Sequence, residues 1–209
     1  MSDAAESRFI AVARVAAGLG GMVALVSLVL VLGGEVARGA DFMGSPPAVL
    51  GGWLSFVAAA LLMVGVSGLA VRFTAGLSAA GVAGLAVLSF ATAMTVGAAS
   101  TLALVVPTLA DKAPSIAADP PAAVPATFIL SGLAMGVSGI VLAVALRRAA
   151  PWLPRWSTAL LIVGSVVTIV PLPSRYFLLA FAVAALLGSS QGLRRSGGRR
   201  AGAVTASAP

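Results

Sequence analysis

The chain contains five or six long apolar stretches, and none of them includes an acidic residue. About 20 consecutive apolar residues are enough for one helix to cross the hydrocarbon core of a bilayer. Inside lipid, every backbone N–H and C=O group must find its hydrogen-bond partner within the protein, which a helix achieves within one segment. The pattern therefore predicts an all-α integral membrane protein. Composition agrees, because 60% of the residues are hydrophobic and only 9% are charged, against about 25% charged residues in soluble domains.

Four of the stretches are each long enough to form a complete span. They cover approximately residues 15–32, 48–71, 77–106 and 126–146. Charged residues or prolines bound them, and Pro107 is expected to stop the third. This third stretch is longer than a bilayer requires, so it should tilt or project from the membrane.

The last apolar region is interrupted between Pro171 and Arg175, which leaves two short pieces at residues 156–170 and 176–188. Each piece would be only about 20 to 23 Å long as a helix. We expect a bundle of six transmembrane helices, and the alternative is four spans plus a C-terminal re-entrant hairpin. Both place the C-terminus on the same side of the membrane as the N-terminus.

Basic residues are distributed unequally between the two sides of the predicted bundle. One side has only Arg38, Lys112 and Arg175. Basic loops are retained in the cytoplasm, so residues 1–14 and 189–209 are predicted to be cytoplasmic and to flank a single transmembrane domain at 15–188. The other ten basic residues all fall on this cytoplasmic side: Arg8, Arg14, Arg72, Arg147, Arg148, Arg155, Arg194, Arg195, Arg199 and Arg200.

The character of the C-terminal tail and the source of the chain also follow from composition. Residues 189–209 are rich in Gly, Ser, Ala and Arg, which predicts a disordered basic tail. The preference for Arg over Lys, with abundant Ala, Gly and Val, indicates a GC-rich bacterial genome and hence a bacterial cell membrane. The positive charge is explained by topology, so the lipid bilayer is an expected partner and nucleic acid is not.

Composition also argues against most catalytic chemistry. The chain has no Cys and no His, which removes thiolate nucleophiles, the commonest general base and the commonest metal ligands. The segment Gly136–Gly139 looks like the G-x-S-G motif of rhomboid proteases, but a serine nucleophile needs a neighbouring base, and the same letters recur at Gly65–Gly68. We therefore expect no catalytic, cofactor-binding or metal site, no cofactor and no enzymatic activity.

Small residues inside the stretches indicate where helices pack. Glycine lets helix backbones approach closely, either between helices of one chain or between copies in a dimer. The candidate packing residues are Gly65, Gly68, Gly132, Gly136 and Gly139.

Polar residues within and beside the stretches are the remaining candidates. Ser89, Thr92 and Thr95 could line a polar path through the third stretch, or they could bond to carbonyl groups of their own helix. Tyr176 is expected to act as an aromatic anchor at the outer interface. Contacts with anionic lipid are possible for the arginines next to the cytoplasmic interface, which are Arg147, Arg148, Arg194, Arg195, Arg199 and Arg200.

The segment from Ala145 to Gly164 combines Arg147, Arg148, two prolines and Trp156 ahead of a fresh apolar run. It resembles the basic, proline-containing hairpin loop of small uncharacterised multi-pass membrane proteins of high-GC actinobacteria. The resemblance implies no activity and supplies no site residues. The expected function is non-catalytic, through helix packing of the chain with itself or with partner membrane proteins. The alternative is a transporter or facilitator subunit for a small neutral or apolar solute.

Overall fold

Every regular element in the part of the chain that the computed structural model describes is a helix. The described part comprises residues 3–38, 45–113, 115, 122–170, 172 and 174–189. The all-helical prediction is therefore confirmed for these residues. The elements are α1 (Asp3–Arg38), α2 (Pro46–Phe73), η2 (Thr74–Gly76), α3 (Ala79–Ser100), η3 (Thr101–Val105), α4 (Val106–Lys112), α6 (Ala123–Ala149), α7 (Arg155–Ile169) and α8 (Phe177–Gly188).

Four helical segments are long and apolar enough to cross a membrane, judged by length and composition. Two shorter apolar helices, α7 and α8, follow them. Each of the six stretches that hydropathy picks out coincides with one of these segments and extends beyond it by at most two residues. The four long segments are Asp3–Ala37, Pro46–Gly76, Ala79–Leu109 and Pro125–Ala149.

The third long segment does not stop at Pro107 as the sequence pattern predicts. Helix α3 runs into the π-helical segment η3, and α4 then carries the helix on to Lys112. Proline has no N–H group, and its ring clashes with the carbonyl group four residues earlier in a regular α-helix. The wider π-turn, in which the N–H group of Val106 donates to the carbonyl oxygen of Thr101, lets the chain continue past this proline.

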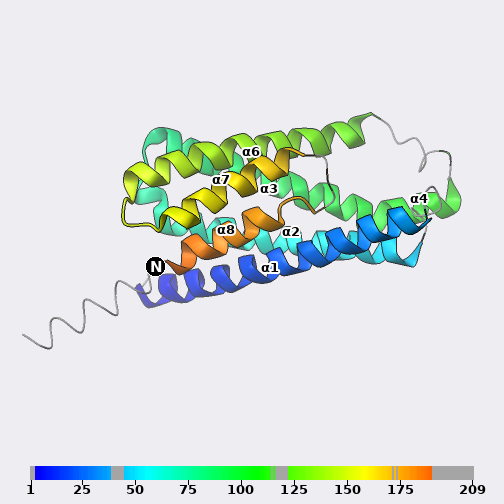
Figure 1. Cartoon of the computed structure of the whole chain (residues 1–209), viewed down its shortest axis with the longest axis horizontal. Coiled ribbons are helices and arrows are strands. Elements are labelled where there is room, and N and C mark those ends of the chain that lie inside the picture. Colours follow the sequence, from blue (N-terminus) through cyan, green and yellow to red (C-terminus); the bar gives the residue numbers. More distant parts are fainter. Residues whose placement is uncertain are drawn as a thin grey trace, which may run out of the picture.

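The helices form a closed ring in which the last helix meets the first (Figure 1). Helix α1 packs against α2 and α8, α3 packs against α2 and α6, and α7 joins α6 to α8. Helix α8 also contacts α2, and none of its residues is exposed. This enclosure suits its sequence, because α8 contains no polar side chain and a helix that is apolar on all sides is stable only when it is buried.

Two arginines hold the C-terminal end of α8. The Nη1 atom of Arg72 in α2 donates to the carbonyl oxygen of Leu187 at 2.7 Å. The guanidinium group of Arg14 in α1 lies so close to Gly188 that a Cβ atom there would be 2.9 Å from Nε. Both cations are favourable at this place, since the C-terminus of a helix carries a partial negative charge. We call this end of the bundle, which also carries Arg147, Arg148 and Arg155, the basic end.

The hairpin formed by α7 and α8 is shorter than the helices around it (Figure 1). Helix α7 has 15 residues and α8 has 12, whereas α1 has 36. At 1.5 Å per residue, these lengths are about 22, 18 and 54 Å. Helix α7 begins and helix α8 ends at the basic end. The turn between them therefore lies inside the bundle rather than at its opposite end.

Glycines permit the close approach of several helix pairs. A Cβ atom at Gly65 would lie 2.7 Å from the Cβ atom of Ala17 in α1, and one at Gly68 would overlap Ala13. Gly136 and Gly139 of α6 lie in the same way against Ile169 and Ser165 of α7. The predicted packing glycines of α2 and α6 thus lie at crossings between helices of the same chain.

Candidate functional site

The turn between α7 and α8 carries three polar residues into the interior of the bundle. Ser174 is 5% exposed, Arg175 is 6% exposed and Tyr176 is 3% exposed. Ser27 of α1, which is fully buried, and Ser55 of α2, which is 8% exposed, lie against this turn. We call these five residues the tip cluster.

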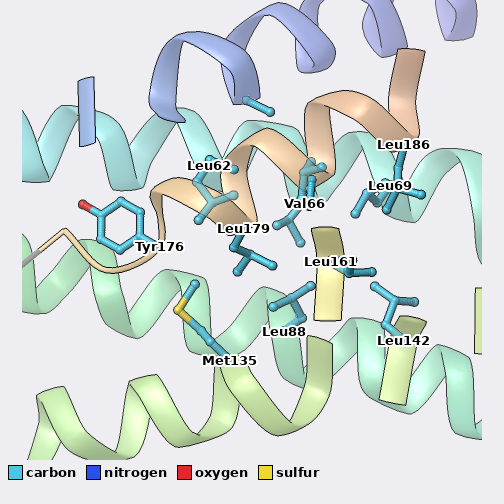
Figure 2. Packing of buried hydrophobic residues seen from close by; sticks show 14 of the residues in the cluster. Leu62, Val66, Leu69, Leu88, Met135, Leu142, Leu161, Tyr176, Leu179 and Leu186 are labelled. Atoms are coloured by element: carbon cyan, nitrogen blue, oxygen red, sulfur yellow. The ribbon is translucent and has the colours of Figure 1, made fainter. Parts of the chain in front are cut away.

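Tyr176 connects the turn to α2. Its hydroxyl group donates to the carbonyl oxygen of Ser55 at 2.5 Å. Because the phenol has a single proton, the 3.0 Å contact between the two side chains is a bond donated by the hydroxyl group of Ser55 to the phenol oxygen. The ring of Tyr176 packs beside Leu62 and Leu179, and its hydroxyl group points away from the leucine cluster (Figure 2). The residue therefore separates an apolar core from a polar layer.

Ser174 connects the turn to α1. Its hydroxyl group donates to Oγ of Ser27 at 2.8 Å, and Ser27 donates in turn to the carbonyl oxygen of Gly51 at 2.8 Å. Ser174 has a φ angle of 50°, in the left-handed region that non-glycine residues seldom adopt. Such strain persists only where surrounding contacts impose it, and it concentrates at functional sites.

Arg175 is held by neutral groups of α6 and α7. Its Nη2 atom donates to the carbonyl oxygen of Phe128 and to Oγ of Ser131, and Nη1 donates to the carbonyl oxygen of Val170. No ion pair of Arg175 with a carboxylate is present within the described ranges. Gly132 of α6 makes room for the guanidinium group, since a Cβ atom there would lie 2.5 Å from both Cζ and Nη2.

A cavity of about 280 Å³ opens beside the tip cluster, on the side away from the leucine core. All five residues of the cluster line it, together with Thr95 of α3. The remaining wall is mostly apolar, and Glu35 belongs to the wall as its one described acid. The other lining residues are Val31, Ala48, Val49, Gly51, Gly52, Ala99, Leu102, Val106, Pro107, Phe128 and Leu172.

The π-helical segment and a glycine pair shape the wall of this cavity. Gly52 of α2 lies directly on η3, because a Cβ atom at position 52 would be 3.2 Å from the carbonyl oxygen of Leu102. A Cβ atom on Gly51 would meet Val31 at 2.6 Å. Single π-turns inside α-helices occur frequently at functional sites. The cavity thus combines a strained turn, a π-turn and two close backbone approaches.

The predicted polar lining of α3 is only partly at the cavity. Ser89, Thr92 and Thr95 each donate to the carbonyl oxygen four residues earlier in their own helix, at 2.7 to 2.9 Å. Thr95 alone among these three lines the cavity, and it also contacts Sδ of Met135 at 3.2 Å. Ser89 and Thr92 do not line the cavity, and their hydroxyl groups bond within α3.

Sequence reasoning missed most of the tip cluster. Arg175 was expected on the outer side of the membrane and Tyr176 at the outer interface, yet both are buried in the bundle. Ser27 and Ser55 are isolated serines in apolar stretches, and the sequence pattern does not distinguish them from other serines. A usable signal was present in the run Ser174, Arg175 and Tyr176, since three polar residues stand between apolar pieces that are both short for spans.

Two of the arginines predicted to contact lipid, Arg147 and Arg148, lie at the opposite end of the bundle from this cavity. Arg147 and Arg148 end α6 and are exposed at the basic end. The predicted sites Arg194, Arg195, Arg199 and Arg200, with the predicted disordered tail, lie outside the described residues.

Comparisons with models of protein families, with curated proteins and with solved structures found no match for this chain. The functional argument therefore rests on the geometry of the tip cluster and its cavity.

Proposed function

We propose that this chain is a multi-pass protein of the bacterial cell membrane with both termini in the cytoplasm, and that it binds a small solute in the cavity beside the tip cluster. The accumulation of arginines at the basic end supports this orientation, because cytoplasmic segments carry an excess of basic residues. The cavity then opens from the outer half of the membrane. No described feature supplies a nucleophile with a base, so the proposed role is non-catalytic.

We infer further that α7 and α8 form a re-entrant hairpin rather than two complete spans. The tip residues bond to interior positions of their neighbours: Ser27 lies 11 residues before the end of α1, and Ser55 lies nine residues after the start of α2. These distances along the helices correspond to about 16 and 14 Å. Non-helical backbone at such depth is tolerated where it is buried in protein or lines a cavity, and this turn does both.

The single observation that carries the binding proposal is a cavity with apolar walls and convergent polar groups at one end. Ligand sites are largely apolar, with a few placed polar groups that orient the ligand, and have volumes of about 300 to 1,000 Å³. A volume of about 280 Å³ fits a small solute. The packing role remains a prediction, but a cavity with clustered hydroxyl groups favours the transporter or facilitator alternative.

The tip cluster indicates the chemistry of the solute. The four hydroxyl protons of the cluster are donated within it or to the carbonyl oxygens of Gly51 and Ser55. The guanidinium group, a cation without an ion-pair partner among described residues, is therefore the donor that remains for a solute. A buried charge is costly unless it is paired. We therefore propose a solute with an apolar body and an anionic or hydrogen-bond-accepting group, of which a short monocarboxylate is the simplest case.

Labelling of a single cysteine in the cavity tests this proposal. The natural chain has no cysteine, so Val49→Cys places one thiol in the cavity wall without adding bulk. A membrane-impermeant maleimide should label Val49→Cys in intact cells, and hexanoate should slow the labelling. Hexanol should need about 10 to 100 times the concentration, because a hydrogen bond to a charged group contributes about 1.5 to 3 kcal/mol.

Ser7→Cys is the matched control, because Ser7 is exposed near the start of α1 at the basic end. It should be labelled only after the cells are permeabilised and should be indifferent to hexanoate. Labelling of Ser7→Cys from outside would contradict the orientation. Equal labelling of Val49→Cys with and without hexanoate, hexanol and longer carboxylates would contradict the solute class.

A further inference from the structure

A second concave site lies at the basic end, on the opposite half of the molecule from the tip cluster. It is a groove of about 310 Å³ between the last turns of α6 and the first turns of α7. Arg147 and Arg148 line it from α6, and Arg155 lines it from α7. Three arginines thus line one concave surface.

These three cations have no counter-charge within the part of the chain that the structure describes. None of them forms an ion pair or a hydrogen bond there, and all three are exposed. Like charges held close together repel, so an anion that binds between them relieves the repulsion and gains charge-assisted hydrogen bonds. The groove is therefore complementary to an anionic group.

Thr158 provides a second, independent indication of a ligand. It is 4% exposed, it lines the groove, and its Oγ1 atom is buried without a hydrogen-bond partner. The hydroxyl group of its neighbour Ser157 donates to the carbonyl oxygen of Pro154 at 2.8 Å. Buried hydroxyl groups in proteins are almost always paired. Because Thr158 lines the groove, an acceptor bound there is an available partner for its hydroxyl group.

The remaining wall of the groove is apolar and continues along the helices away from the arginines. Val144 is 44% exposed one turn before Arg147, and Ile162 is 39% exposed two turns after Arg155. A free inorganic anion gains no binding energy from an apolar surface, whereas the acyl chain attached to a phosphate group can pack against it. We propose that this groove binds one anionic phospholipid, with its phosphate at the three arginines and Thr158 and its acyl chain along Val144 and Ile162.

Native mass spectrometry of the full-length protein in a mild detergent tests this proposal. The probes are phosphatidylglycerol and phosphatidylcholine with identical acyl chains, added in equal amounts. The wild-type protein should retain phosphatidylglycerol in preference to phosphatidylcholine. Each of Arg147→Gln, Arg148→Gln and Arg155→Gln should reduce that preference about fivefold, the factor that corresponds to about 1 kcal/mol per arginine near an anionic surface.

Two further variants separate a built site from general surface charge. Arg8→Gln removes an exposed arginine of α1 at the same end and should leave the preference unchanged. Thr158→Val keeps the shape of the side chain and should weaken phosphatidylglycerol binding while phosphatidylcholine binding stays the same. Unfolding temperatures without added lipid verify that every variant is folded.

Four results would overturn the proposal. They are equal retention of the two lipids by the wild type, a loss in Arg8→Gln as large as that in Arg155→Gln, full preference in Thr158→Val, and complete displacement of phosphatidylglycerol by millimolar inorganic phosphate. The last result would assign the groove to a free anion instead of a lipid.

Discussion

At the scale of single residues, the most consequential feature is a buried arginine held by carbonyl groups. Arg175 donates to the carbonyl oxygens of Phe128 in α6 and of Val170, the residue that follows α7. A cation near the last carbonyls of α7 is favourable electrostatically. The same residue gives the cavity its positive charge, so the packing of the turn and the charge of the cavity depend on one side chain.

Gly132→Ala should displace this arginine. The new Cβ atom would overlap the guanidinium group and the carbonyl oxygen of Thr168, each 2.5 Å away. We expect a loss of about 1 to 3 kcal/mol in the free energy of unfolding, measured by denaturation in detergent, and loss of hexanoate protection in Val49→Cys. Gly97→Ala is the control, because nothing lies within 4 Å of that position and alanine is the better helix former. Equal stability of the two variants would contradict the placement of Arg175.

Tyr176→Phe tests the link between the turn and α2. The change leaves the carbonyl oxygen and hydroxyl group of Ser55 without their phenol partner. We expect destabilisation by about 1 to 3 kcal/mol, the cost of unpaired buried groups. In a double-mutant cycle with Ser55→Ala, the two effects should be clearly non-additive. Additive effects would show that the two side chains do not interact.

At the scale of elements, helix positions were predictable and the bonds that join elements were not. Residues 48–71 and 126–146 were predicted as helical spans, and the structure has helices at Pro46–Phe73 and Ala123–Ala149. Hydropathy suffices here because runs of apolar residues of this length have few alternatives. The tip cluster was not predictable in this way, since Ser27 and Tyr176 are 149 positions apart and only the ring closure brings them together.

The π-turn before α4 is the element most open to a direct test. Pro107→Ala restores an N–H group at this position, so η3 and α4 should relax toward a regular α-helix. Such a change rotates Leu102 and Val106 relative to α2 and alters the wall of the cavity. We expect the maleimide labelling rate of Val49→Cys to change severalfold, with little loss of helix content by circular dichroism. An unchanged labelling rate would show that the π-turn does not shape the cavity.

At the scale of the whole molecule, the described charges gather toward the two ends of the bundle, except for Arg175. Thr74 lies two residues after Arg72 at the basic end, and Asp111 lies in the last turn of α4 at the opposite end. The side chains of Thr74 and Asp111 are both exposed. Cysteines at these two positions should therefore be labelled by an impermeant maleimide from opposite sides of the membrane. Asp111→Cys should react in intact cells and Thr74→Cys only after permeabilisation. The reverse result would invert the molecule and place the cavity on the cytoplasmic side.

The contact between the first and last helices has a consequence for biosynthesis. The face of α1 that carries Ala13, Ala17 and Gly21 packs partly against α8, where Gly21 touches the ring of Phe181. A ribosome makes α8 after every other described helix. This face of α1 therefore stays incompletely covered until α8 has been made. The tip cluster can also form only late in synthesis, because Ser174, Arg175 and Tyr176 are made just before α8. A nascent chain arrested before residue 174 would therefore hold the four long helices but neither the closed ring nor the cavity beside the tip cluster.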